Sequence, residues 1–198
     1  MKPIVVLHRA VLAAALLPAA WLVYGAFSGG LTANPIDYLT DTTGSTALAL
    51  LVLTLTVTPL RRLTGWHALI QLRRTLGLLA FFYACLHFLT WSVLDWFFDF
   101  AFMAEDIVER PFITMGMTTF LLLVPLALTS SAAMIRRLGR RWQTLHRLVY
   151  VAAITAVIHF WWIVKADFRE PRLWALALCV LFGFRAWPIV RARVLSRS

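Results

Sequence analysis

The sequence contains few charged residues. Asp, Glu, Lys and Arg together make up 14% of the 198 residues, whereas they make up about 25% of a typical soluble domain. Hydrophobic residues account for 61% of the chain, and they gather in runs long enough to cross a bilayer as helices. This composition excludes a soluble globular domain and predicts an all-α integral membrane protein.

Cysteine is also scarce. The chain has two cysteines, Cys85 and Cys179, and both fall inside apolar runs, where thiols usually behave as small apolar side chains. They predict neither a disulfide framework nor a zinc site. The motif Cys-x-x-Cys-His is absent from the sequence, so any haem bound by this chain would be held without a covalent attachment.

Acidic residues are scarcer than basic ones. Nine Asp and Glu stand against 19 Lys and Arg, which gives a formal net charge of +10. Such a charge can indicate nucleic-acid binding. Here the basic residues lie in short clusters between apolar runs, as membrane topology requires. We therefore expect a lipid membrane around this chain and no nucleic acid.

Six apolar segments are predicted to cross the membrane. They cover approximately residues 10–27, 45–60, 75–96, 112–130, 144–167 and 171–189. The first segment follows a basic start, as a secretory signal would. Its length, its residues Pro18 and Trp21, and the lack of a clear small-residue cleavage site favour a retained membrane anchor.

The loops between these segments alternate in charge. If the amino terminus is cytoplasmic, 15 of the 19 basic residues lie on the inner side and all nine acidic residues lie on the outer side. Cytoplasmic loops of membrane proteins carry the excess of Lys and Arg. The alternation therefore predicts a six-helix bundle with both termini in the cytoplasm.

Two histidines inside apolar segments are the first candidate site. His87 lies 13 residues after Arg74, and His159 lies 12 residues after Arg147. On helices that run in the same direction, both would sit about 18 to 20 Å from the cytoplasmic boundary. Two imidazoles at equal depth can bind one b-type haem from opposite sides. Five aromatic residues are expected to flank the ring: Phe81, Phe82, Tyr83, Phe88 and Phe160.

These histidines have two alternative roles, a helix–helix hydrogen bond and a zinc site. A single histidine in a membrane helix can simply hydrogen-bond a neighbouring helix. That role does not predict a second histidine at the same depth. A structural zinc site closes with four ligands, usually including cysteine, whereas a bis-histidine haem needs only two. The pair His87 and His159 therefore predicts haem iron as the bound metal.

A third histidine, His146, lies 13 residues before His159 and therefore nearer the cytoplasmic side. A weak internal similarity, in which proline and Arg-Arg-Leu precede each membrane histidine, places Arg74 opposite His146. His146 is a candidate ligand of a second haem with an unusual or missing second ligand. Alternatively, Arg73 and Arg74 pair with haem propionates or an anionic cofactor, or they serve topology alone. His67 is a candidate substitute ligand, although its loop position favours simple exposure.

Several longer strings resemble a known family. They are LTVTPLRRLTG, RRTLGLLAFFYACLHF, DIVERPFITMGM, PLALTS, RRLGRRWQTLHRLVY and HFWWIVKAD, in family order between residues 54 and 167. They are similar to the MsrQ family, also called YedZ, the haem-binding membrane subunit of the bacterial periplasmic methionine sulfoxide reductase. The resemblance implies a ferric-reductase-like transmembrane domain with b haem, one or two per chain, on His87, His159 and His146.

The resemblance also implies partners and a location. Electrons would come from the quinone pool or a cytoplasmic flavin reductase and pass to a periplasmic molybdopterin methionine sulfoxide reductase catalytic subunit. The chain would be a multi-pass protein of the bacterial inner membrane, with no substrate-converting site of its own. An FMN cofactor is implied by the family as well, but the sequence contains no flavin motif that would locate it.

These observations divide the chain into three parts. Residues 1–43 form an N-terminal helix and periplasmic loop, residues 44–167 a haem-binding four-helix core, and residues 168–198 a C-terminal helix with a basic cytoplasmic tail. Two other functions stay open: a cytochrome b-type reductase of ferric or other metal ions, and a haem-free membrane transporter or assembly factor whose histidines relay protons.

Overall fold

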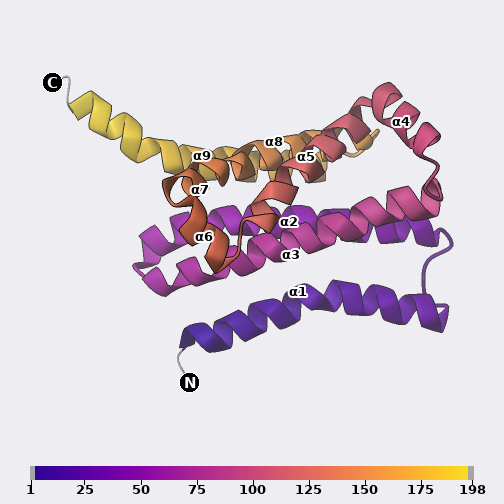
Figure 1. Ribbon diagram of the computed structural model, residues 1–198, viewed down its shortest axis with the longest axis horizontal. Coiled ribbons are helices and arrows are strands. Elements are labelled where there is room, and N and C mark those ends of the chain that lie inside the picture. The colour runs from indigo at the N-terminus through magenta and orange to yellow at the C-terminus, as the bar shows by residue number, and fades with distance from the viewer. Residues whose placement is uncertain (1–2, 196–198) are drawn as a thin grey trace.

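The computed structural model describes residues 3–195, and their side chains as far as Trp187. It is a bundle of helices (Figure 1), and no strand occurs within the described residues. The α-helices are α1 (Pro3–Ser28), α2 (Pro35–Thr64), α3 (Leu72–Leu89), α4 (Phe100–Glu109), α5 (Pro111–Leu128), α6 (Ala132–Leu138), α7 (Arg140–Leu145), α8 (Leu148–Ile163) and α9 (Arg169–Leu195). A 3-10 turn, His67–Gln71, precedes α3, and a π-helical turn, Thr90–Asp95, follows it.

Five helical stretches within the described residues are long and apolar enough to cross a membrane. They are Pro3–Ser28, Pro35–Thr64, His67–Asp95, Pro111–Leu128 and Arg140–Ile163. They match the first five predicted segments, so the prediction of an all-α membrane protein is confirmed. The sixth predicted segment lies within α9. A sixth membrane crossing, and the cytoplasmic placement of both termini, stay predictions.

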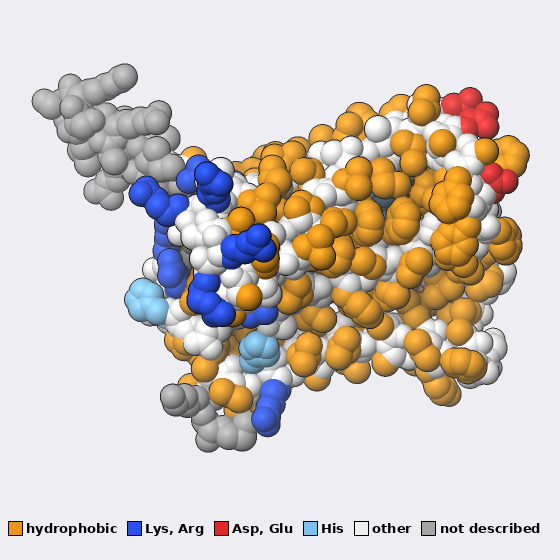
Figure 2. Space-filling view, in the orientation of Figure 1, with side chains coloured by type: hydrophobic (Ala, Val, Ile, Leu, Met, Phe, Trp, Pro, Cys, Tyr) orange, Lys and Arg blue, Asp and Glu red, His pale blue; other side chains and the backbone are white. Residues whose placement is uncertain are grey.

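The two ends of the bundle carry opposite charges. α1 begins and α9 ends at the same end of the bundle (Figure 1). Lys and Arg side chains gather at this end, and Asp and Glu side chains are seen at the opposite one (Figure 2). We call them the basic end and the acidic end. This separation is the one that the alternating loops predict, because consecutive long helices return the chain to alternate ends.

Two helix pairs form the centre of the bundle. α2 packs along α3, α5 packs along α8, and α3 joins the two pairs through α5. Ala152 and Ala153 of α8 are fully buried, because small side chains let membrane helices approach closely. A hydrogen bond of 2.7 Å from Thr119 to the hydroxyl of Thr155 links α5 to α8. α9 packs against α8 and α2, whereas α1 lies on the outside against α2 and α3.

Tyr83 attaches α1 to the bundle. Its hydroxyl donates to the carbonyl of Ala15 at 2.6 Å and accepts from the amide of Ala19 at 3.0 Å. In an uninterrupted helix these two backbone groups would bond each other, so the hydroxyl is inserted into the ladder beside Pro18. Tyr83 is fully buried there. The polar tip of Tyr83 is therefore committed to α1, and the contact of its ring with a haem stays a prediction.

Tyr83→Phe is expected to lower stability, because the Ala15 carbonyl and the Ala19 amide lose their shared partner inside the membrane. We expect a loss of about 1–3 kcal/mol, measured as a fall in the thermal unfolding midpoint of the detergent-solubilised protein. Tyr24→Phe is the matched control, since Tyr24 is 64% exposed on the same helix α1. Equal midpoints for the two variants would contradict this role of Tyr83.

The connection between the third and fourth predicted segments contains a helix, α4. Asp99 starts it by accepting hydrogen bonds from the amides of Ala101 and Phe102 at 3.1 and 3.2 Å, a typical N-cap. The buried carboxylate of Asp106 then accepts from the indole nitrogens of Trp91 and Trp96 at 3.0 and 3.1 Å. It also pairs with Arg110 at 2.9 Å. These contacts tie α4 to the end of α3, above the histidine pair.

Candidate cofactor site

His87 and His159 face each other across the bundle. His87 stands near the end of α3 and His159 near the end of α8. Their ring centres are 6.0 Å apart, and the ring planes are inclined by 75°. Two imidazoles bound to opposite sides of one metal would have ring centres about 6 Å apart, since each metal–nitrogen bond is about 2 Å long. The structure thus brings together the two residues that the sequence pairs at equal depth.

The two imidazoles are held in the same way. Nδ1 of His87 lies 3.0 Å from the carbonyl oxygen of Thr40, and Nδ1 of His159 lies 2.6 Å from that of Phe112. A carbonyl oxygen only accepts hydrogen bonds, so Nδ1 must carry the proton in both rings. Each Nε2 then keeps its lone pair. Metal-binding histidines are commonly oriented by such a bond from the other ring nitrogen.

Two glycines make room for the histidine rings. A Cβ placed on Gly44 of α2 would lie 2.9 Å from Cε1 of His87, and one on Gly116 of α5 would lie 2.8 Å from Cε1 of His159. Real Cβ atoms essentially never come this close to another heavy atom. Each glycine stands four residues after the carbonyl that accepts the Nδ1 hydrogen bond. Glycine is therefore required at both positions for close approach of the ring to the helix.

The two halves of this site are built alike. In each half, the accepting carbonyl precedes its histidine by 47 positions. The repeated Arg-Arg-Leu is evident in the sequence, whereas the role of the two glycines is not. Their equal spacing to the two histidines was the available signal. This equal spacing points to a site only when α2 is known to pack along α3, and α5 along α8.

An aromatic stack joins α3 to α5 in the helix pairs that carry the site. Phe88 stacks on Phe120 of α5 with ring centres 4.8 Å apart, and Phe81 stacks on the same ring at 6.0 Å. Phe120 was not singled out from the sequence. Phe82 is 41% exposed and meets Tyr83 edge-on, so it lies outside this stack. Phe160 is partly buried against the core.

His146 lies away from the pair, towards the basic end. Its ring stacks on Trp142 with ring centres 3.9 Å apart, and its Nδ1 lies 3.1 Å from the carbonyl oxygen of Trp142. Its Nε2 is buried and has no hydrogen-bond partner within the described part of the chain. Arg73 is partly buried, whereas Arg74 is exposed. Of the two arginines, Arg73 is therefore the better candidate to pair with a haem propionate or an anionic cofactor.

The remaining histidines have other surroundings. His67 is exposed in the turn before α3, so it does not join either site. His8 of α1 lies 3.0 Å from the hydroxyl of Thr75 of α3, a contact that helps to hold α1. Neither residue contributes to the cofactor site.

The chemistry of the donors fits haem better than a bare metal ion. Among residues 3–195, no group of three or more His, Cys, Asp or Glu side chains is close enough to hold a metal ion. A bis-histidine haem needs two imidazoles with free Nε2 atoms and apolar surroundings. His87 and His159 provide the nitrogens, the two glycines provide clearance, and the helices that carry them are largely apolar.

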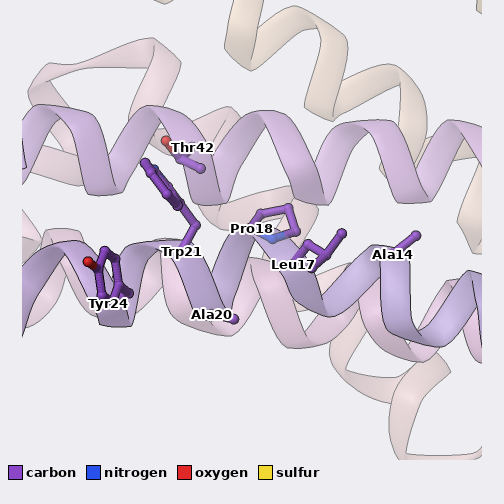
Figure 3. Close-up of a pocket in the computed structure, with 7 residues that line it drawn as sticks. All are labelled: Ala14, Leu17, Pro18, Ala20, Trp21, Tyr24 and Thr42. Atoms are coloured by element: carbon purple, nitrogen blue, oxygen red, sulfur yellow. The ribbon is translucent and has the colours of Figure 1, made fainter.

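Outside the histidine pair, α1 and α2 enclose a shallow apolar groove. Its lining is made by side chains of α1 with Thr42 of α2 (Figure 3): Ala14, Leu17, Pro18, Ala20, Trp21, Tyr24 and Thr42. It contains no histidine or charged side chain. It therefore offers nothing that could bind a metal or an ionic group.

Comparisons with known proteins show the family of the chain. Residues 43–157 match the family described as ferric reductase like transmembrane component. The chain is 50% identical over 177 residues to the protein-methionine-sulfoxide reductase heme-binding subunit MsrQ of Herminiimonas arsenicoxydans, covering 88% of this chain and 81% of that protein. It is 53% identical over 178 residues to the MsrQ of Azospira oryzae, covering 89% of this chain and 76% of that protein. No solved structure matches.

Proposed function

Since the chain belongs to the MsrQ family of heme-binding subunits of protein-methionine-sulfoxide reductase, we propose that it carries electrons across the bacterial inner membrane through b haem. The observation that supports this most is the facing pair His87 and His159, with both Nδ1 atoms bonded to carbonyls. Haem bound there would supply one-electron transfer at iron. The protein has no need of a substrate-converting site for this task.

The residues around the pair have defined tasks in this proposal. The Thr40 and Phe112 carbonyls keep each Nδ1 protonated and each Nε2 available for iron. Gly44 and Gly116 let the rings lie against α2 and α5. The stack of Phe81, Phe88 and Phe120 excludes water from one side, which affects the reduction potential of a bound haem.

The direction of transfer follows from the two ends of the bundle. The histidine pair lies nearer the acidic end, which we assign to the periplasm by the positive-inside rule. There the periplasmic molybdopterin catalytic subunit would dock on the acidic loops and accept electrons to repair oxidised methionines. Electrons would enter from the quinone pool or from a cytoplasmic flavin reductase. FMN would be a further cofactor by family resemblance, and His146 with Arg73 is a candidate for a second haem.

A test separates this function from its alternatives. The purified protein is reduced anaerobically, mixed with the methionine sulfoxide reductase catalytic subunit and an oxidised protein substrate, and followed by its haem absorbance. We expect rapid reoxidation of the haem only when both are present. Reoxidation by ferric citrate alone, with none by the catalytic subunit, would favour a metal reductase. A colourless preparation without b-type bands would favour a haem-free transporter or assembly factor.

A further inference from the structure

The face of α4 that points away from the bundle carries a line of apolar side chains. Phe100, Ala104 and Val108 follow one another at intervals of four residues, so they lie on one face of the helix. All three are exposed, Phe100 to 75% and Val108 to 82%. We call these three residues the apolar stripe. A large exposed apolar surface on a folded protein marks a contact with lipid or with another protein.

A second line of side chains on α4 is acidic. Glu105 and Glu109 are four residues apart, and both are exposed. Each of them follows a residue of the apolar stripe by one position, which turns it by about 100° around the helix axis. We call this pair the acidic stripe. α4 therefore presents two different surfaces outside the bundle.

The opposite face of α4 is fixed to the bundle. Met103 and Asp106 are buried there, and the Asp106 carboxylate accepts hydrogen bonds from the indole nitrogens of Trp91 and Trp96. Trp96 also stacks on Phe102 with ring centres 5.7 Å apart. These contacts hold α4 against rotation about its axis, so the apolar stripe stays turned away from the bundle.

The lengths of the neighbouring helices place α4 at the membrane surface. The helical stretch before it, His67–Asp95, has 29 residues, about 43 Å of helix. This matches a bilayer with its headgroups, about 40–45 Å. The helix after it, Pro111–Leu128, has 18 residues, about 27 Å, close to the hydrocarbon core of about 30 Å. α4 joins the two at the acidic end (Figure 1), so it lies at the level of the headgroups.

The turn that leads into α4 exposes two more large apolar side chains. Phe97 and Phe98 are both exposed, and both have a positive φ, 47° and 61°, which bulky residues rarely adopt. Hydrogen bonds from their amides to the carbonyls of Val93 and Ser92 hold this turn. The two rings lie between the end of α3 and the apolar stripe. Hydrophobic side chains cover the visible face of the bundle as far as this end (Figure 2).

We propose that α4 is an interfacial helix whose apolar stripe, with Phe97 and Phe98, inserts among the phospholipid headgroups and upper acyl chains at the acidic end. Phospholipid is the partner that fits, because the stripe continues the apolar surface of the spans at the level of the headgroups. Helices that lie in this layer combine an apolar face with a charged one. The acidic stripe then faces water, at the end where the catalytic partner is proposed to dock.

The test compares the two stripes by spin labelling in lipid nanodiscs. A chain with Cys85→Ala and Cys179→Ala receives one nitroxide-labelled cysteine at a time, through Ala104→Cys, Glu105→Cys, Val108→Cys or Glu109→Cys. Electron paramagnetic resonance then measures collisions of the label with oxygen, which concentrates in lipid, and with a water-soluble nickel chelate. We expect the oxygen-to-nickel ratio to be several times higher on the apolar stripe than on the acidic stripe.

Two outcomes of the labelling would overturn the inference. One is an equal ratio at all four positions. The other is access of nickel to the apolar stripe that is lost only when the methionine sulfoxide reductase catalytic subunit is added, because the stripe would then be a docking surface for protein.

Val108→Asn and Glu109→Asn test lipid contact without labels. Val108 has little contact with the rest of the protein, and valine and asparagine have similar helix propensities. Val108→Asn should therefore affect stability only where lipid surrounds the side chain, since an unpaired amide is unfavourable in apolar surroundings. We expect a lower thermal unfolding midpoint in nanodiscs for Val108→Asn than for Glu109→Asn. Equal midpoints would show that Val108 faces water, against the proposed insertion.

Discussion

His87→Ala and His159→Ala are each expected to abolish the b-type bands of the haem held between α3 and α8. The two rings face one another with centres 6.0 Å apart, so removing either leaves the iron with one axial ligand. Loss of an outer-shell partner alone costs about 10- to 100-fold in metal affinity, and loss of a ligand should cost at least as much. The measurement is haem per polypeptide, with the reduced-minus-oxidised difference spectrum.

The matched control for these variants is His67→Ala, since His67 is exposed in the turn before α3. It should leave haem content and spectrum unchanged. His146→Ala should leave the bands of the His87 and His159 haem intact, because His146 belongs to the basic end. Unchanged bands in both His87→Ala and His159→Ala would contradict the assignment of these two residues.

The depth of the two histidines could be predicted from the sequence because depth depends only on helical rise. Each residue advances about 1.5 Å along the axis, and arginine clusters mark the cytoplasmic boundary. Counting from those clusters placed His87 and His159 at the same level, and the structure brings their rings together. The all-α fold followed in the same way from the lengths of the apolar runs.

The direction in which side chains point could not be predicted in this way. Tyr83 and His87 are four residues apart on α3 and share one face, yet Tyr83 bonds to α1 while His87 bonds to α2. In runs that are apolar on every side, hydrophobic periodicity does not identify the face that meets a neighbour. Phe120 was missed for this reason, and Phe82 was expected beside the haem although it is 41% exposed.

The glycines were missed for a related reason. Their roles depend on contacts between helices that are distant in sequence. Gly44 and Gly116 read as ordinary small residues, because the ring that each one accommodates belongs to another helix.

Gly44→Ala and Gly116→Ala are expected to weaken haem binding about tenfold, although the same change elsewhere in a helix is usually favourable. Alanine normally gains about 0.5–1 kcal/mol over glycine inside a helix. Here the new methyl group would lie 2.8 to 3.0 Å from Cε1 and Nδ1 of the facing histidine. The ring must move, and the Nδ1 bond to Thr40 or Phe112 that orients it must lengthen.

Gly77→Ala is the control that isolates this steric effect. Gly77 lies on α3, the helix that carries His87, and the nearest atom to a Cβ placed there is Cγ2 of Thr54 at 3.9 Å, an ordinary contact. Gly77→Ala should therefore keep its haem and unfold at an equal or higher temperature. Haem per polypeptide and thermal midpoint are measured on all three variants.

Because His159 is the more closely approached ring, Gly116→Ala should lose at least as much haem as Gly44→Ala. Full haem retention by Gly44→Ala and Gly116→Ala would mean that the histidine rings do not need the space that the glycines leave. It would also contradict the proposal that the two carbonyls orient the rings for haem binding.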